Sequence, residues 1–212
     1  MLRGYFGAKS TQNSVESQKS REFRKLLDRE EEDHNDLVSL PVLDSQFNNS
    51  QKLKLYSKYL TENLDFEHLL LTDDTTFLFT QNILPMLDNM QSSSKLWWSA
   101  FDVFKKTGEF AENYVDKFTS LTYPPVPQTQ TMLMSSHHVH YLANNVHFLK
   151  QFSSLQTSVG VWLSSVETKR HQDQFWNMKA CLNKTIDKSF LACSNLSSDD
   201  MKTIWNKMRK RH

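Results

Sequence analysis

The sequence feature that most restricts the possible folds is a run of apolar residues that leads into two acids. It reads Leu69-Leu70-Leu71-Thr72-Asp73-Asp74-Thr75-Thr76-Phe77. The three leucines predict a short buried strand, which places the two carboxylates at the end of that strand. Two carboxylates in such a position can hold a hard divalent cation against phosphate oxygens. An acidic pair can equally start a turn or cap a helix. We therefore predict a strand with Asp73 and Asp74 as candidate metal ligands.

Helices and strands alternate along the first half of the chain. Apolar spacing predicts helices over 16–33, 53–64, 81–90, 135–148 and 156–166, and a short capped helix from 198 onward. Strands are predicted over 36–43, 69–71 and 96–101. This alternation favours an α/β fold with a partly parallel sheet, in which ligands bind at the carboxyl ends of the strands. We see no repeat or linker and predict flexible residues 1–21 followed by a single domain over 22–212.

Composition narrows the class of protein. Of 212 residues, 38% are apolar and 23% are charged, which is typical of a soluble globular chain. The net charge of +1 implies no strong field for nucleic acid or for a membrane surface, so no nucleic-acid partner is expected. Neither a membrane span nor the apolar core of a signal peptide is recognisable. Taken literally, the chain would be cytosolic, or would have lost an N-terminal portion.

Two cysteines and three glycosylation sequons bear on the compartment. Cys181 and Cys193 are twelve residues apart, a spacing that fits either a disulfide in an oxidising compartment or two unpaired thiols. The sequons begin at Asn48, Asn183 and Asn195. They matter only if the chain enters the secretory pathway.

Several segments surround the acidic pair in a definite order. Upstream lie Asp36-Leu37-Val38 and the stretch Leu43-Asp44-Ser45-Gln46-Phe47-Asn48-Asn49-Ser50-Gln51-Lys52. Downstream lie Trp97-Trp98, Lys106-Thr107-Gly108, Tyr123-Pro124-Pro125, and Lys169-Arg170-His171-Gln172-Asp173 continuing to Trp176. In this order they resemble the β-1,3-galactosyltransferase family of hexosyltransferases (glycosyltransferase family 31), nearest to its type 2 β-1,3-N-acetylgalactosaminyltransferase branch. The resemblance extends over roughly residues 22 to 178.

This resemblance implies a fold and an activity. The fold would be a glycosyltransferase-A-like nucleotide-binding sandwich with a mixed, mainly parallel sheet that lacks its first strand. The activity would be transfer of a hexose or N-acetylhexosamine from a UDP-sugar to a glycan acceptor on a glycoprotein, with manganese as cofactor. Asp73 and Asp74 would hold the metal, and Asp73 and Lys52 would bind the nucleotide. The family resemblance also implies the membrane of the Golgi or endoplasmic reticulum.

Three departures from the family pattern affect chemistry. Thr75 stands where a third acid is expected, and Thr129 and Thr131 replace the glycines of a tight turn. Leu155-Gln156 replaces the acidic pair that supplies the general base, and neither side chain accepts a proton near neutral pH.

Three hypotheses about function follow. The chain is a divergent hexosyltransferase, an inactive pseudoenzyme that binds another glycosyltransferase or a glycoprotein, or a generic soluble interaction domain.

Histidines and tryptophans offer weaker signals. His137, His138 and His140 share a predicted helix, but not at the spacing of four that would aim two rings at one metal. We therefore predict surface or half-buried histidines. The pair Trp97-Trp98 is predicted to lie in the core, although in this fold class it can also line the acceptor side.

Overall fold

The computed structural model describes residues 5–8, 18–43, 45, 48–90, 94–103, 122–152, 154–177, 181 and 189–209. The helices are α1 (Gln18–His34), α2 (Asn49–Asn63), α3 (Thr80–Asn89), α4 (Ser136–Asn144), α5 (Leu155–Leu163), α6 (Ser198–Arg209) and the 3-10 helix η3 (Gln174–Asn177). The strands are β1 (Tyr5–Ala8), β2 (Leu37–Leu40), β3 (His68–Leu71), β4 (Phe77–Leu78), β5 (Leu96–Ser99), β6 (Phe101–Asp102), β7 (Val126–Pro127), β8 (Met132–Ser135), β9 (Lys169–Gln172) and β10 (Ala192–Cys193). Each predicted helix and strand is present, with shifted ends. None of the helices within these described ranges combines the length and apolar character needed to cross a bilayer.

The main sheet has four strands in the order β3-β8-β5-β9. Strand β8 runs antiparallel to both β3 and β5, whereas β5 and β9 are parallel. The predicted α/β class and mixed sheet are confirmed, since β3, β5 and β9 share one direction and β8 runs against them. The alternation of helices and strands does not continue into β8, because an antiparallel neighbour needs no helical crossover. Strands β3, β5 and β9 therefore point the same way and end at one edge, the carboxyl edge.

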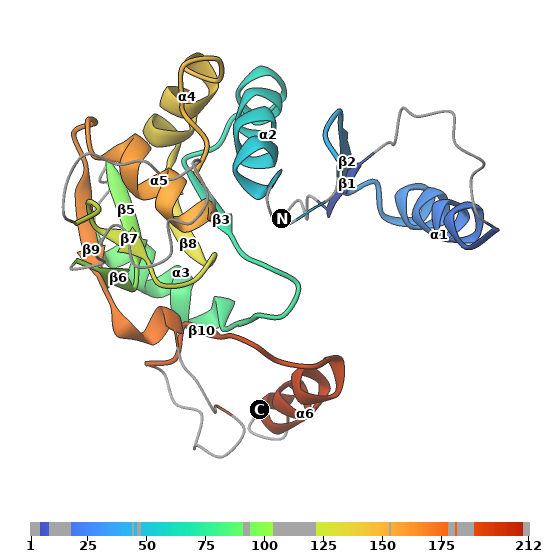
Figure 1. Ribbon diagram of the computed structural model, residues 1–212. Helices are drawn as coiled ribbons and strands as arrows, with labels where there is room; N and C mark the ends of the chain where they lie inside the picture. The colour runs from blue at the N-terminus through green and yellow to red at the C-terminus, as the bar shows by residue number, and fades with distance from the viewer. Residues whose placement is uncertain are drawn as a thin grey trace.

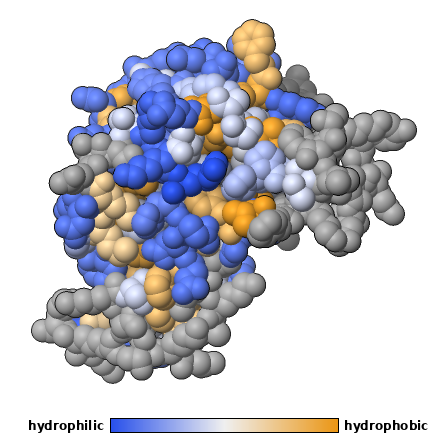
Figure 2. Space-filling view, turned by 90° about the vertical axis from the view of Figure 1, so that its left-hand side faces the viewer, coloured by the Kyte–Doolittle hydropathy of each residue, from blue (hydrophilic) through white to orange (hydrophobic). Residues whose placement is uncertain are grey.

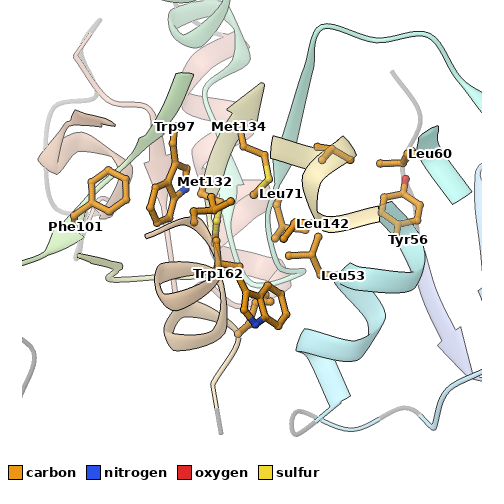
Figure 3. Close-up of a cluster of buried hydrophobic side chains, with 14 of the residues drawn as sticks. Leu53, Tyr56, Leu60, Leu71, Trp97, Phe101, Met132, Met134, Leu142 and Trp162 are labelled. Atoms are coloured by element: carbon orange, nitrogen blue, oxygen red, sulfur yellow. The ribbon is translucent and has the colours of Figure 1, made fainter. Parts of the chain in front are cut away.

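Buried side chains form a core on each face of this sheet, because successive residues of a strand point to opposite sides. In β5, Trp97 joins one core, while Leu96 and Trp98 join the other. The first core packs the sheet against α2, α4 and α5; Figure 3 shows Leu53, Leu71, Trp97, Met132, Met134, Leu142 and Trp162 among its members. The second core packs the sheet against α3, η3 and β10; it contains Ile83, Leu96, Trp98, Ala100, Leu133, Trp176, Leu191 and Ala192. The molecule is thus layered around its sheet, as Figure 1 shows.

The N-terminal part contains a second, two-stranded sheet. Strand β1 pairs in parallel with β2, and α1 lies beside them on the side of the molecule away from β9 (Figure 1). Strand β1 and the first turn of α1 fall within residues 1–21, whose flexibility stays a prediction. Helix α1 ends at His34, and the next residue, Asn35, has a φ of 50°, the left-handed conformation that asparagine tolerates after a helix. The Leu37 N–H then donates to Glu31 Oε2 at 2.8 Å, which ties the helix to β2.

A disulfide joins Cys181 and Cys193, with their Cα atoms 6.2 Å apart, so the first of the two cysteine alternatives is confirmed. Both residues are fully buried in a third apolar cluster with Phe79, Phe190 and Ile204. Strand β10, which contains Cys193, pairs antiparallel with β4. This strand pairing connects the C-terminal part of the chain to the segment that follows β3, and the disulfide ties Cys181 to β10.

The outermost strand of the sheet order, β9, was not predicted. All four of its side chains are exposed, and three of them are Lys169, Arg170 and His171. Figure 2 shows that the side of the molecule where β9 lies is largely hydrophilic, with scattered apolar residues. Charged side chains on an outer strand discourage pairing with another chain. They also leave no apolar alternation from which the strand could be predicted.

Two buried polar side chains connect the layers. Lys54 of α2 donates to the carbonyl oxygens of Val146 and Leu149, just beyond α4, at 3.2 and 3.1 Å. Burial lowers the pKa of Lys54 from its ordinary value. His138 of α4 is fully buried, with Nδ1 3.1 Å from Ser135 Oγ and Nε2 3.1 Å from Thr168 Oγ1. These bonds satisfy both ring nitrogens, so His138 is a structural residue of the core.

Protonation of His138 is expected to destabilise the fold. Burial, with a smaller effect of His137, lowers the pKa of His138 from 6.5 to about 4. The neutral ring therefore stabilises the fold above the unfolded-state pKa of 6.5, and this contribution is lost as the pH falls towards 4. Between about pH 7 and about pH 5, the free energy of unfolding should fall by about 2 kcal/mol more in the wild type than in His138→Gln. Urea unfolding at several pH values measures this difference.

The exposed His140 supplies the control for that experiment. His140→Gln should keep the pH dependence of the wild-type chain, because it changes only an exposed side chain of the same helix. Equal pH dependence of the wild type and His138→Gln would contradict a neutral buried His138.

Candidate functional site

The carboxyl edge of the main sheet brings together segments that are far apart in the sequence. The segment Thr72–Thr76 follows β3, Ala100 follows β5, and Asp173 follows β9. The antiparallel β8 begins at the same edge, directly after Thr131. In α/β sheets, this edge is where ligands bind. The predicted placement of Asp73 and Asp74 at the carboxyl end of a strand is confirmed.

Asp73 organises the turn that follows β3. Its Oδ1 accepts three hydrogen bonds: from the Thr75 N–H at 3.1 Å, the Thr75 hydroxyl at 2.8 Å and the Thr76 hydroxyl at 2.7 Å. This is the local bonding by which aspartate stabilises a turn. Thr75, which stands at the position of the expected third acid, therefore binds Asp73 instead of contributing a carboxylate. Asp74 is exposed to solvent.

The far side of this turn is fastened to the C-terminal part of the chain. The Leu196 N–H donates to the Thr75 carbonyl oxygen at 2.8 Å. Just beyond the turn, Phe77 of β4 pairs with Cys193 of β10, whose sulfur belongs to the disulfide. The turn carrying the two acids is thus held from within by Asp73 and from outside by backbone hydrogen bonds.

The segment that precedes β8 packs directly against the same turn. The hydroxyls of Thr72 and Thr131 lie 3.2 Å apart, and Thr131 is fully buried. The Ser99 hydroxyl donates to the Thr131 carbonyl oxygen at 3.0 Å, and the Thr131 N–H donates to Thr129 Oγ1 at 3.3 Å. Threonine side chains therefore occupy the positions at which the family resemblance predicts glycines, and their hydroxyls make hydrogen bonds there. A ligand that approached the glycine backbone closely would meet these side chains here.

The first turns of α2 and α5 come close to this segment. Asn49, the first residue of α2, donates through Nδ2 to Gln130 Oε1 at 3.4 Å. The hydroxyls of Ser50 in α2 and Ser158 in α5 lie 2.8 Å apart in the interior. Helix α5 is capped by Ser154, whose Oγ accepts from the Thr157 N–H at 3.1 Å. Free N–H groups and the helix dipole make such helix starts attractive to anions.

Two predicted residues belong to these helix starts. Lys52 lies in the first turn of α2 and is buried, with 7% of its surface exposed. Gln156 lies in the first turn of α5 and is half-buried. Four residues later on the same helix face, Gly160 packs against Val126 and Pro125. A Cβ at Gly160 would lie 2.5 Å from Val126 Cγ1 and 2.9 Å from the Pro125 carbonyl oxygen, so only glycine fits this helix contact.

Other predicted candidates lie elsewhere or take structural roles. Trp97 and Trp98 are buried in the two cores, so neither offers surface to an acceptor. His137 and His140 are exposed as predicted, whereas His138 is more deeply buried than expected. Asp44, Gln46-Phe47 and Lys106-Thr107-Gly108 lie outside the described residues.

Two carboxylates at the carboxyl edge had no predicted role. Asp102 is the last residue of β6, the short strand after β5, and is exposed. Asp173 follows β9, and its Oδ1 accepts from the Phe175 N–H at 2.9 Å. The strand β9 that positions Asp173 carries no apolar pattern, so only the pairing with β5 reveals that Asp173 lies at this edge.

Metal-binding capacity is limited in the part of the chain that the structure describes. There, no three or more His, Cys, Asp or Glu side chains gather closely enough to share a metal ion. Divalent cations of the magnesium type are nevertheless often held by one or two carboxylates together with substrate phosphates. The exposed Asp74, with Asp73 beside it, fits the protein's share of such a mixed set.

Comparisons with known proteins converge on one family. The family model described as galactosyltransferase matches residues 15–174. The curated protein UDP-GalNAc:beta-1,3-N-acetylgalactosaminyltransferase 2 is 26% identical over 184 residues in Mus musculus and 27% identical over 214 residues in Danio rerio. Beta-1,3-galactosyltransferase 6 of Mus musculus is 27% identical over 186 residues.

Coverage by these matches is uneven. The three alignments cover 85%, 99% and 85% of this chain, in the order given above. They cover only 35%, 41% and 56% of the length of the respective relatives, so the chain spans about half or less of each one. A solved structure of a glycosyltransferase involved in the glycosylation of the major capsid of PBCV-1 is 10% identical, with a TM-score of 0.44 over 98% of this chain and 100% of that chain.

The two acids at the carboxyl edge are expected to differ in their effect on stability. Asp73→Ala removes the acceptor of three hydrogen bonds, so it should lower the free energy of unfolding by about 1–3 kcal/mol. Asp74→Ala alters an exposed side chain and should change it by less than about 0.5 kcal/mol. Urea unfolding provides both values. If the two variants are equally stable, Asp73 does not hold the turn.

Proposed function

This chain belongs to the galactosyltransferase family, and we propose that its carboxyl edge binds the diphosphate of a UDP-sugar without a working general base. In this proposal it is a divergent β-1,3-hexosyltransferase-like protein whose transfer activity is lost or very low. The single observation that carries the proposal is the meeting of the Thr72–Thr76 turn, the Thr131 segment and the first turns of α2 and α5. A nucleotide-sugar donor and a glycan acceptor are the general substrates of such a family.

Binding of the diphosphate would depend on the helix starts. A diphosphate carries negative charge, and the N–H groups at the start of α2 and of α5 offer donors and a positive dipole end. Lys52 places a cationic side chain within the first turn of α2. The relatives' names specify a UDP-sugar and a β-1,3 linkage, which supports a donor of the same class here.

Manganese would be held by Asp73 and Asp74 only when the diphosphate supplies further oxygens. The metal would neutralise the charge of the bound diphosphate. Asp73 uses Oδ1 to hold the turn, which leaves the exposed Asp74 as the freer carboxylate. We therefore propose that metal binding depends on the nucleotide.

Proton transfer is where this chain differs from an active transferase. A general base takes the proton from the acceptor hydroxyl during transfer. At the family's base position, Gln156 carries a neutral amide, and the preceding Leu155 is apolar and buried. This supports the second candidate function, an inactive relative that binds a glycosyltransferase or a glycoprotein as a partner or chaperone. A lumenal location in the Golgi or endoplasmic reticulum is part of the proposal, and the Cys181–Cys193 disulfide supports it.

Calorimetric titration with UDP and manganese tests the binding proposal. UDP should bind when manganese is present, a chelator should weaken that binding about tenfold or more, and manganese alone should give no heat. Asp74→Asn removes the charge without touching the Asp73 hydrogen bonds and should weaken UDP binding like the chelator. The control Asp88→Asn, at an exposed acid of α3, should bind like the wild type. A flat titration of the wild-type chain would contradict nucleotide binding.

A UDP-release assay separates the transferase from the inactive relative. With UDP-galactose or UDP-N-acetylgalactosamine and a glycan acceptor, the wild-type chain and Gln156→Ala should both release UDP at the rate of the protein-free buffer. An active member of the family serves as the positive control. Turnover by the wild-type chain would contradict the loss of the base and direct attention to Asp173, which lies at the same edge.

A further inference from the structure

We propose that Asn195 is a site of N-linked glycosylation. Asn195-Leu196-Ser197 is a sequon in the connection between β10 and α6. Asn195 is exposed, and its φ of 61° places it at a turn of the chain. The bulky, hydrophilic glycan needs such a surface position, and asparagine tolerates this left-handed conformation better than most residues.

The neighbouring disulfide connects this site with the compartment in which glycans are added. Cys193 lies two residues before Asn195, and its bond to Cys181 is fully buried. Disulfides of this structural kind form in oxidising compartments such as the endoplasmic reticulum, where N-glycosylation also takes place. This inference rests on the lumenal location proposed above, but not on nucleotide binding.

The sequon at Asn48 has a different environment. The Asn48 side chain is half-buried and donates through Nδ2 to the Leu43 carbonyl oxygen at 3.0 Å. Its sequon serine, Ser50, is 1% exposed and bonded to Ser158 in the interior. A glycan on Asn48 would compete with these contacts at the start of α2. The fold therefore accommodates a glycan on Asn195 more easily than one on Asn48. Asn183 lies outside the described residues.

A glycan on Asn195 would stand beside the candidate site. The next residue, Leu196, donates its N–H to the Thr75 carbonyl oxygen in the turn that carries the two acids. The sequon serine also has a structural role, because Ser197 Oγ accepts from the Asp200 N–H at 3.2 Å at the start of α6. Substitution of Ser197 would thus disturb the helix start as well as the sequon.

The test therefore changes the asparagines and leaves Ser197 intact. Asn195→Asp keeps the size of the side chain and its tolerance of positive φ but cannot accept a glycan. Asn48→Asp is the matched control. The full 212-residue chain, preceded by a cleavable signal peptide, is expressed in a eukaryotic secretory host. Glycopeptides are mapped by mass spectrometry, and the Cys181–Cys193 bond is mapped in the same sample.

We expect the glycan on Asn195 in most of the disulfide-bonded protein. Asn195→Asp should lose one glycan, seen as increased gel mobility that glycosidase treatment of the wild type reproduces, whereas Asn48→Asp should keep the wild-type pattern. Disulfide-bonded protein with unmodified Asn195 would overturn the proposal. An unmodified Asn195 in protein that lacks the Cys181–Cys193 bond would overturn it as well. A flat UDP titration does not affect this result, so the two proposals fail separately.

Discussion

Burial of β8 on both faces is the constraint on which this structure depends. The strand lies between β3 and β5, and both of its faces are covered. Met132 and Met134 pack into one core, and Leu133 packs into the other. Every helix that packs on the sheet contacts one of these cores. The same strand begins directly after Thr131, so the burial of β8 also sets the position of the segment that meets the turn of the two acids.

Polar groups at the carboxyl edge have become structural. Asp73 accepts the hydrogen bonds that hold its turn. Thr131 occupies a position where the family resemblance predicts glycine, and its hydroxyl contacts that of Thr72. Gln156 lies in the first turn of α5 and carries no group that can accept a proton. Each of these contacts stabilises the edge, and none contributes a base. These structural roles are the physical ground on which the proposed function separates nucleotide binding from turnover.

Sequence patterns predicted the elements whose residues follow a regular apolar period. The Leu69–Leu71 strand, the helix that became α2 and the aromatic strand β5 were all identified, because burial on one or two faces leaves a period in the sequence. Strand β8 was missed because its short apolar run directly adjoins α4, where the apolar spacing predicted a helix from residue 135 onward. Strand β9 was missed because its stability comes from backbone pairing with β5, which leaves no mark on exposed side chains.

By itself, the sequence determined the α/β class, the family and the position of two acids at a strand end, because these depend on local period and on the order of motifs. Tertiary structure decided the antiparallel course of β8, the pairing of Cys181 with Cys193 and the use of Asp73 Oδ1 within its own turn. Those outcomes depend on contacts between residues far apart in the chain or on the direction of a single oxygen. A linear pattern of residue types does not contain that information.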